Sequence, residues 1–114
     1  MSVSPEYRDW VIEQLRYAGS VTGRAMFGGY GIYLDGSIFG LIADDILYFK
    51  VDDSNRPEFE AVGMGPFRPF KDSSEVMQYY EVPADVLEDR TRLAEWARRA
   101  ALVSRRSSMK KRKK

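Results

Sequence analysis

The sequence predicts an α+β domain of two layers, an antiparallel sheet of about five strands with helices on one face, in the order α-β(3)-α-β(2)-α. Apolar residues recur at helical spacing near both ends of the chain, and runs rich in aromatic and β-branched residues lie between them. The connections between these runs are too short for parallel crossovers. A length of 114 residues suits one domain.

The first predicted element is a helix that begins after Ser4. Ser4 is a preferred N-cap residue, Pro5 suits the first helical position, and Glu6 lies near the positive end of the helix dipole. Gly19 can adopt the left-handed conformation that ends a helix. The apolar stripe of this helix consists of Tyr7, Trp10, Val11, Leu15 and Ala18.

Strand-like patterning replaces helical spacing from Val21 onward. Asp35-Gly36 is the strongest hairpin signal, because a tight type I′ turn needs residues that tolerate positive φ. Asp44-Asp45 predicts the next chain reversal, so we expect a meander. The strand-like runs are residues 25–27, 30–34, 37–43 and 46–51, which we count as about three strands.

A short helix is predicted after residue 55. Asn55 and Glu58 have the spacing of a capping box, and Gly63 can end the helix. The elements expected beyond Gly65-Pro66 are an extended segment at residues 67–70, a polar turn at 71–75, a strand at 76–82 that Pro83 ends, and one helical turn at 85–87.

The last helix is predicted over residues 89–103. Its apolar positions are Leu93, Trp96, Ala97, Ala100 and Ala101. Residues 104–114 are polar and basic except for Met109, so we expect a disordered polybasic tail after a domain of residues 1–103.

Strand alternation predicts which side chains lie on the sheet face without helices. In the strand at residues 46–51, Leu47, Phe49 and Val51 suit the core. The expected interaction face, on the other side of the sheet, consists of Tyr48, Lys50, Tyr79 and Glu81. Tyrosine-rich, partly polar patches suit protein interfaces, so a protein partner or a homodimer is favoured here over stacked nucleic-acid bases.

The charge is divided unequally along the chain. The formal net charge is +1, from 18 basic and 17 acidic side chains. The basic residues after Val103 are Arg105, Arg106, Lys110, Lys111, Arg112, Lys113 and Lys114. The remaining 11 basic and 17 acidic side chains give the domain a charge of −6. The segment resembles a nucleic-acid-binding arm, and a solubilising tail remains an equal alternative.

Several classes of function are excluded by composition. The chain has no cysteine and no histidine, which excludes thiolate nucleophiles, Ser-His-Asp triads, Cys/His zinc sites and iron–sulfur clusters. These exclusions remove much of enzymology, and we expect no cofactor and no metal. Turn chemistry explains the acid pairs Asp44-Asp45 and Asp52-Asp53 more simply than a metal site or a carboxylate-based hydrolase.

The ends of the chain contain no secretion or membrane signal. The first seven residues lack an apolar core segment, and no apolar run approaches the ~20 residues of a membrane span. We expect a soluble cytoplasmic protein with no membrane partner.

The glycine cluster Gly28-Gly29-Tyr30-Gly31 invites comparison with phosphate-binding loops, because successive backbone N–H groups can hold anions. The cluster lacks both the GxGxxG and the P-loop pattern, and a strand follows it rather than a helix. We therefore interpret these glycines as a bulge or bend where the backbone needs room.

Sequence blocks along the chain resemble one known family. They are Met26-Phe27-Gly28-Gly29-Tyr30-Gly31-Ile32-Tyr33-Leu34-Asp35-Gly36, then Phe39-Gly40-Leu41-Ile42, Leu47-Tyr48-Phe49-Lys50-Val51, Pro66-Phe67, Met77-Gln78-Tyr79-Tyr80-Glu81-Val82-Pro83 and Trp96-Ala97. Together they resemble the N-terminal domain of the TfoX (Sxy) competence-regulator family. The motif positions, which we interpret as mostly structural, are Arg24, Met26, Phe27, Gly28, Gly29, Gly31, Asp35, Gly36, Phe67, Tyr80, Pro83 and Trp96.

The resemblance implies a bacterial cytoplasmic protein with a fold similar to secretion chaperones. It also implies a non-catalytic role in competence gene expression, with transcription machinery or a regulator such as the cyclic-AMP receptor protein as partner. Full-length competence regulators continue into a helical C-terminal domain, whereas this chain stops after its basic segment, so we expect a single-domain member.

Two functions therefore remain open. The first is a regulatory or interaction module that acts through protein contacts and whose basic tail adds affinity for nucleic acid. The alternative is a chaperone-like domain that holds a peptide or small ligand on its open sheet face. The first predicts salt-sensitive binding to DNA, and the second predicts salt-insensitive capture of its partner.

Overall fold

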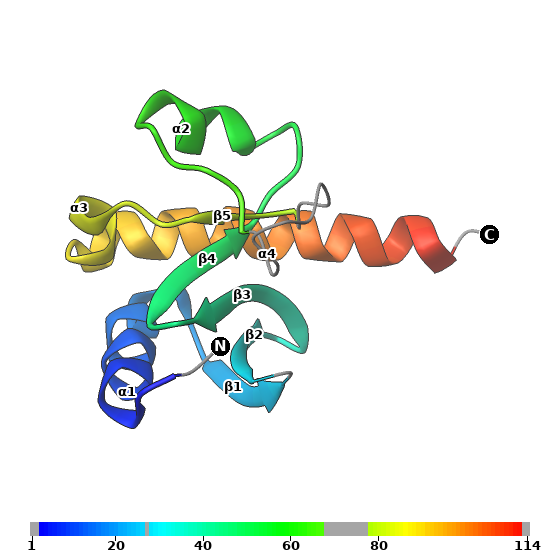
Figure 1. Ribbon diagram of the computed structural model, residues 1–114. Helices are drawn as coiled ribbons and strands as arrows, with labels where there is room; N and C mark the ends of the chain where they lie inside the picture. Colours follow the sequence, from blue (N-terminus) through cyan, green and yellow to red (C-terminus); the bar gives the residue numbers. More distant parts are fainter. Residues whose placement is uncertain (1–2, 27, 68–77, 113–114) are drawn as a thin grey trace.

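The computed structural model describes residues 3–26, 28–67 and 78–112, with side chains up to residue 107 (Figure 1). The elements in chain order are α1 (Pro5–Gln14), η1 (Leu15–Ala18), β1 (Val21–Met26), β2 (Gly29–Leu34), β3 (Ser37–Ala43), β4 (Ile46–Lys50), α2 (Arg56–Ala61), β5 (Tyr79–Glu81), α3 (Ala84–Leu87) and α4 (Arg90–Arg112).

The strands form one antiparallel sheet in the order β1-β2-β3-β4-β5, which confirms the predicted fold class. The order of elements differs in one respect, because among the described residues four strands precede α2 and one follows it. Of the two strands expected after α2, the segment at residues 67–70 is described only at Phe67, and the first two positions of the strand at 76–82 lie outside the described residues. Pro66 forms an isolated bridge with Tyr80.

Two hairpins of the meander turn as the sequence predicts. Asp35 and Gly36 have φ values of 51° and 82°, as a type I′ turn between β2 and β3 requires. Asp44 and Asp45 have φ values of 52° and 56°, so the turn between β3 and β4 uses two aspartates in the left-handed region. Aspartate tolerates this conformation better than most side chains do.

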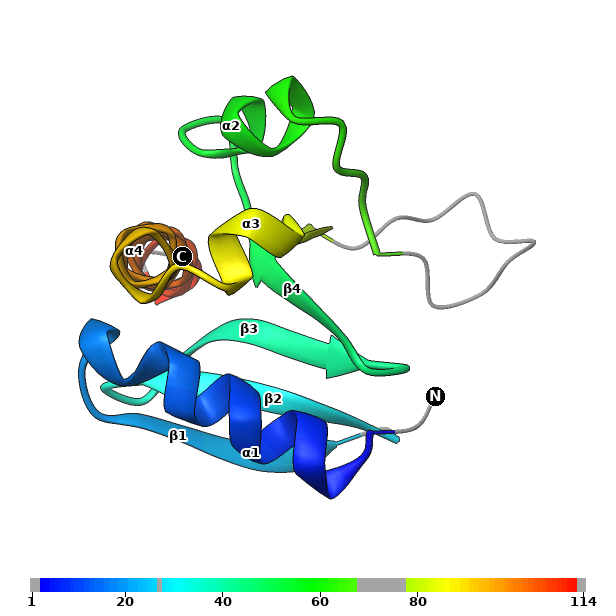
Figure 2. The same cartoon turned by 90° about the vertical axis from the view of Figure 1, so that its left-hand side faces the viewer.

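The helices pack on one face of the sheet (Figure 2). One core cluster joins Val11 and Leu15 of the first helical segment to Phe49 of β4 and Ala97 of α4. Phe59 of α2 packs edge-on against Trp96 of α4, with ring centroids 4.7 Å apart. These contacts confirm the predicted two-layer arrangement.

The first helix is capped as predicted but ends earlier. The Ser4 side chain accepts a hydrogen bond from the Tyr7 N–H at 3.2 Å, and Leu15–Ala18 is a 3₁₀ turn before Gly19 at φ 134°. The amide of Gln14 donates to the Leu87 carbonyl at 2.9 Å and accepts from Arg90 at 3.0 Å. Gln14 therefore joins the first helix to the start of α4.

The last helix corrects the predicted domain boundary. We expected it to end at residue 103, whereas α4 continues to Arg112. Val103 and Ser104 are buried, so the core continues past the predicted end of the helix. The expected disordered tail is therefore wrong for residues 104–112, and residues 113 and 114 lie outside the described chain.

Candidate interaction surfaces

The four residues of the interaction face predicted from strand alternation are neighbours in the sheet. In the antiparallel pairing of β4 with β5, Tyr48 lies opposite Glu81 and Lys50 lies opposite Tyr79. Directly opposite residues in a sheet project from the same face. The four side chains therefore share the face that lies away from the core helices.

The same face continues as an apolar surface across β3 and β2. The register places Leu41 opposite both Tyr48 and Gly31, and Ile38 opposite Tyr33. Tyr33, Ile38, Leu41 and Tyr48 are all half-buried. Within the described chain, the helices contribute no buried side chain to the small cluster on this side of the sheet.

Phe67 helps to bury Tyr79, one of the residues predicted to contact a partner. Its N–H donates to the Tyr79 carbonyl at 2.7 Å, and its ring lies 4.8 Å from that of Tyr48, centroid to centroid. Phe67, Ala43 and Tyr79 form a small buried cluster, and Tyr79 is only 8% exposed. Desolvation, and to a smaller extent Tyr33, raises the pKa of Tyr79. Tyr79 therefore packs beneath the surface of this face. Glu81 is exposed, and Tyr48 and Lys50 are half-buried.

The corner between β4 and α2 is built by Asn55 and Asp52. The expected capping box is wrong, because the Asn55 side chain accepts from the Asp52 N–H at 2.8 Å and donates to the Lys50 carbonyl at 3.0 Å instead of capping α2. Glu58, the other member of that predicted pair, forms an ion pair with Arg99 of α4. The buried Asn55 side chain therefore fixes the path of the chain as it leaves β4.

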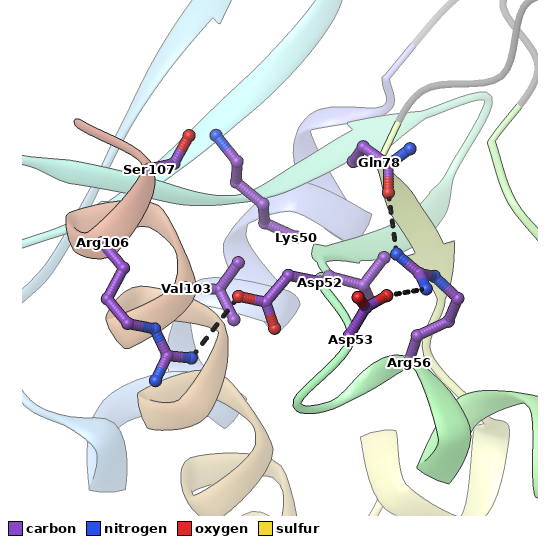
Figure 3. Close-up of a pocket in the computed structure, with 9 residues that line it drawn as sticks. Lys50, Asp52, Asp53, Arg56, Gln78, Val103, Arg106 and Ser107 are labelled. Atoms are coloured by element: carbon purple, nitrogen blue, oxygen red, sulfur yellow. Dashed lines mark hydrogen bonds and ion pairs between the residues drawn. The ribbon is translucent and has the colours of Figure 1, made fainter. Parts of the chain in front are cut away.

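This corner and α4 form the two sides of an open cleft of about 420 Å³ (Figure 3). The polar and charged residues that line it are Lys50, Asp52, Asp53, Arg56, Gln78, Arg106 and Ser107. Arg56 donates to Asp53 at 2.6 Å and to the Gln78 side chain at 3.2 Å, and Arg106 lies 3.5 Å from the Asp52 carboxylate.

Asp52 is the carboxylate in this cleft whose ionisation is most clearly affected. Partial burial opposes the charged form, but hydrogen bonds from the Ser54 hydroxyl and N–H and the positive charges of Arg106 and Arg56 outweigh it and lower the pKa of Asp52. Arg56 of α2 pairs with Asp53 and Arg106 of α4 pairs with Asp52, so these ion pairs join the loop after β4 to both helices.

The predicted nucleic-acid-binding cations separate into two groups. Arg105 and Arg106 lie on α4 and pair with carboxylates of the domain, Arg105 with Asp35 at 3.1 Å and Arg106 with Asp52. The backbone of Lys110, Lys111 and Arg112 is helical, so these residues continue α4 where it extends past the sheet (Figure 1). Lys113 and Lys114 lie outside the described residues.

The glycine cluster has the structural role that the sequence predicts. Gly28 has φ 79°, a β-carbon on Gly29 would lie 2.8 Å from the Ile42 carbonyl oxygen, and one on Gly31 would lie 2.6 Å from the sulfur of Met26. Gly28 therefore adopts a left-handed conformation, and the backbone needs room at Gly29 and Gly31.

The other family positions also have packing roles where the structure describes them. The Arg24 guanidinium lies over the Tyr33 ring at 5.9 Å, and the Tyr80 hydroxyl donates to Glu60 at 3.2 Å. Pro83 precedes α3 as its N-cap residue. Phe27 lies outside the described residues.

Sequence reasoning missed the apolar extension of the open face at Tyr33, Ile38 and Leu41. A register shift in the pairing of β2 with β3 after Ile32 places both Ile38 and Leu41 on this face, although they are three residues apart. Simple alternation through residues 37–43 cannot produce that assignment. The only sequence signal was the apolar character of both faces of this run.

Over residues 3–26, 28–67 and 78–112, no helix is long and apolar enough to cross a membrane. The same part of the chain contains no cluster of three or more side chains that could hold a metal ion.

Comparison with known proteins identifies the family. The TfoX N-terminal domain matches residues 13–103, which include every strand of the sheet and most of α4. No curated protein matches the chain. The match covers most of the sequence and agrees with the motif blocks around the glycine cluster, and the chain belongs to the TfoX N-terminal domain family.

Proposed function

We propose that this protein is a non-enzymatic, cytoplasmic regulatory module that binds a protein partner through the open face of its sheet. The basic end of α4 adds affinity for nucleic acid. The observation on which the proposal rests is the half-buried apolar surface of Tyr33, Ile38, Leu41 and Tyr48, with the exposed Glu81 beside it.

The composition of this face suits a protein interface. Interface centres are more apolar than the rest of the surface and are enriched in aromatic side chains, while polar groups lie around their rims. Tyr48 has both an apolar ring for contact and a hydroxyl for hydrogen bonding. Desolvation and the neighbouring Glu81 raise the pKa of Tyr48, so its hydroxyl remains a neutral donor at physiological pH.

Charge supports a separate site for nucleic acid. The acidic domain repels a polyanion, and the carboxylate of Glu81 lies on the open face itself. The cations from Lys110 onward lie beyond the ion pairs of Arg105 and Arg106 with the domain. Nucleic acid therefore approaches the C-terminal end of α4, while the protein partner binds the sheet.

The family suggests a transcription regulator as partner, with a role in competence. The test is a titration of labelled protein with purified cyclic-AMP receptor protein in the presence of cyclic AMP, followed by fluorescence anisotropy. We expect saturable binding that Tyr48→Ala weakens by about 10-fold, as the loss of an interface tyrosine typically does.

Tyr17→Ala is the matched control for this titration. Tyr17 is 58% exposed and lies in η1, on the helical side of the molecule. Its substitution should leave the affinity unchanged. The proposal fails for this partner when no binding occurs, or when Tyr17→Ala and Tyr48→Ala weaken binding equally.

The alternative, a chaperone-like domain for peptides or small ligands, uses the same open face. A short labelled apolar peptide distinguishes the two functions. Binding of the peptide that is lost in Tyr48→Ala and unchanged by salt, without binding to the regulator, would favour the alternative.

A further inference from the structure

The two edge strands of the sheet differ in whether other residues pair with their outer sides. At β5, residues 65–67 cover the edge, because Phe67 N–H donates to the Tyr79 carbonyl and Glu81 N–H donates to the Gly65 carbonyl at 3.1 Å. At β1, the other edge, none of the described residues pairs with the outer side of the strand. Thr22, Gly23, Arg24 and Ala25 are all exposed.

The hairpin between β1 and β2 determines which backbone groups point outward. Met26 lies opposite Gly29 with two residues between them, and in such a hairpin the flanking residues form a hydrogen-bonded pair. Alternation along the strand then directs Thr22 and Arg24 toward β2 as well. The N–H and C=O groups of Val21, Gly23 and Ala25 point away from the sheet.

We propose that β1 pairs antiparallel with β1 of a second copy of this chain, with Gly23 opposite Gly23. This inference does not depend on the proposed function. In this register Val21 of each copy lies opposite Ala25 of the other. Every outward N–H and C=O group of Val21, Gly23 and Ala25 then has a hydrogen-bond partner. The pairing produces one continuous sheet in which the helices of both copies lie on one face.

Side chains at this edge allow a second strand to approach. On the helix face the strand presents Val21, Gly23 and Ala25, which are small, and the Tyr30 ring of the same chain already lies across Gly23. The Arg8 guanidinium lies over that ring at 5.6 Å and fixes it in this position.

Charge on the open face selects the register. With Gly23 opposite Gly23, each Arg24 faces Thr22 of the other copy. A shift that places Arg24 opposite Arg24 would bring like charges together, and a shift in the other direction would leave Ala25 without a partner in the strand. A self-complementary strand of this kind fits a second copy better than it fits an unrelated extended peptide.

Sedimentation equilibrium of the full chain tests the association. We expect a monomer–dimer equilibrium that Ala25→Pro abolishes, because proline removes an outward N–H while the hydrogen bonds of β1 to β2 remain. Ala25→Val is the matched control, since it keeps the N–H and suits a strand. Circular dichroism and thermal melting confirm that each variant is folded.

A pair of substitutions at Thr22 tests the register itself. Thr22→Glu places a carboxylate opposite Arg24 of the second copy and should tighten dimerisation by about 3- to 10-fold, and Thr22→Lys should weaken it by a similar factor. Amide hydrogen exchange supplies an independent measure, because the amides of Val21, Gly23 and Ala25 should become protected as the protein concentration rises.

Three results would overturn the proposal. The first is a monomer at all concentrations up to about 1 mM. The second is a dimer that Ala25→Pro leaves intact, or one that Tyr48→Ala dissociates while Ala25→Pro does not, which would place self-association on the open face. The third is an equal effect of Thr22→Glu and Thr22→Lys.

Discussion

The backbone of Gly29 passes so close to the carbonyl oxygen of Ile42 that a β-carbon on this glycine would lie 2.8 Å from that oxygen. The obstacle is main chain of the neighbouring strand β3, so it cannot be relieved by rotating a side chain. Gly29 is therefore required by the spacing between β2 and β3.

Gly29→Ala should destabilise the fold by about 1–3 kcal/mol, because the strands must separate to admit the new methyl group. Thermal or urea unfolding measures the difference. Gly65→Ala is the matched control, since nothing lies within 4 Å of the position of its β-carbon and its φ is not in the left-handed region. An equal change in stability for the two variants would contradict this account.

Tyr79→Ala should cost about 3 kcal/mol of folding free energy, because it empties the small cluster formed with Phe67 and Ala43. Tyr48→Ala should cost less, since Tyr48 keeps part of its ring in solvent. Urea denaturation of both variants gives the comparison. If Tyr79→Ala were as stable as the unmodified protein, Phe67 would not cover Tyr79 in solution.

Stability should fall at acidic pH partly through Asp52. The pKa of this carboxyl is lowered in the folded state from an ordinary value of 3.8. Its contribution is therefore fully present above that value and is lost as the pH falls through the lower folded-state pKa. The pair with Arg106 is partly exposed, so the contribution should stay below about 1 kcal/mol.

Comparison with Asp52→Asn isolates this contribution. Urea midpoints of the two proteins should differ near pH 6 and converge as the pH falls through the folded-state pKa of Asp52, because protonated aspartic acid and asparagine are both neutral. A difference in midpoint that stays constant over this range would contradict the assignment.

Binding of duplex DNA should depend on fewer cations than the sequence contains after Val103. If Arg105 and Arg106 keep their carboxylate partners, five basic residues remain, and log K against log[salt] should have a slope of about −4.5 rather than about −6. Fluorescence anisotropy of a short labelled duplex in a salt series measures the slope.

Truncation after Ser107 is the sharper test of the nucleic-acid site at the end of α4. It removes the five remaining cations and keeps the buried Val103 and Ser104. It should abolish DNA binding near physiological salt. Arg105→Ala with Arg106→Ala is the matched control and should change the slope little. The opposite pattern would place the nucleic acid on the ion-paired arginines.

Local patterns in the sequence predicted much of this fold. Asp35-Gly36 and Asp44-Asp45 form the predicted turns, and alternation correctly placed Tyr48 on one face and Phe49 in the core. These features depend on residues close together in the chain, or on the period of two that any strand imposes. The family resemblance was confirmed over residues 13–103.

Contacts between distant residues account for the differences. Arg106 has carboxylate and hydroxyl partners on Asp52 and Ser54, and these help to hold residues of α4 that appear unstructured from composition alone. Phe67 covers Tyr79 through a hydrogen bond to a strand twelve residues later in the chain. Neither relationship follows from local sequence, because each depends on which segments the fold brings together.

The link from Gln14 to Leu87 and Arg90 has a consequence for how the chain folds during synthesis. The meander from β1 to β4 has short connections and can form soon after its residues leave the ribosome. Val11 and Leu15 of the first helical segment cover only part of the apolar side of that meander until α4 arrives, because α4 supplies Leu93, Ala97 and Ala100 to the core. The nascent chain therefore exposes part of this apolar surface, which is prone to aggregation, until α4 has been translated.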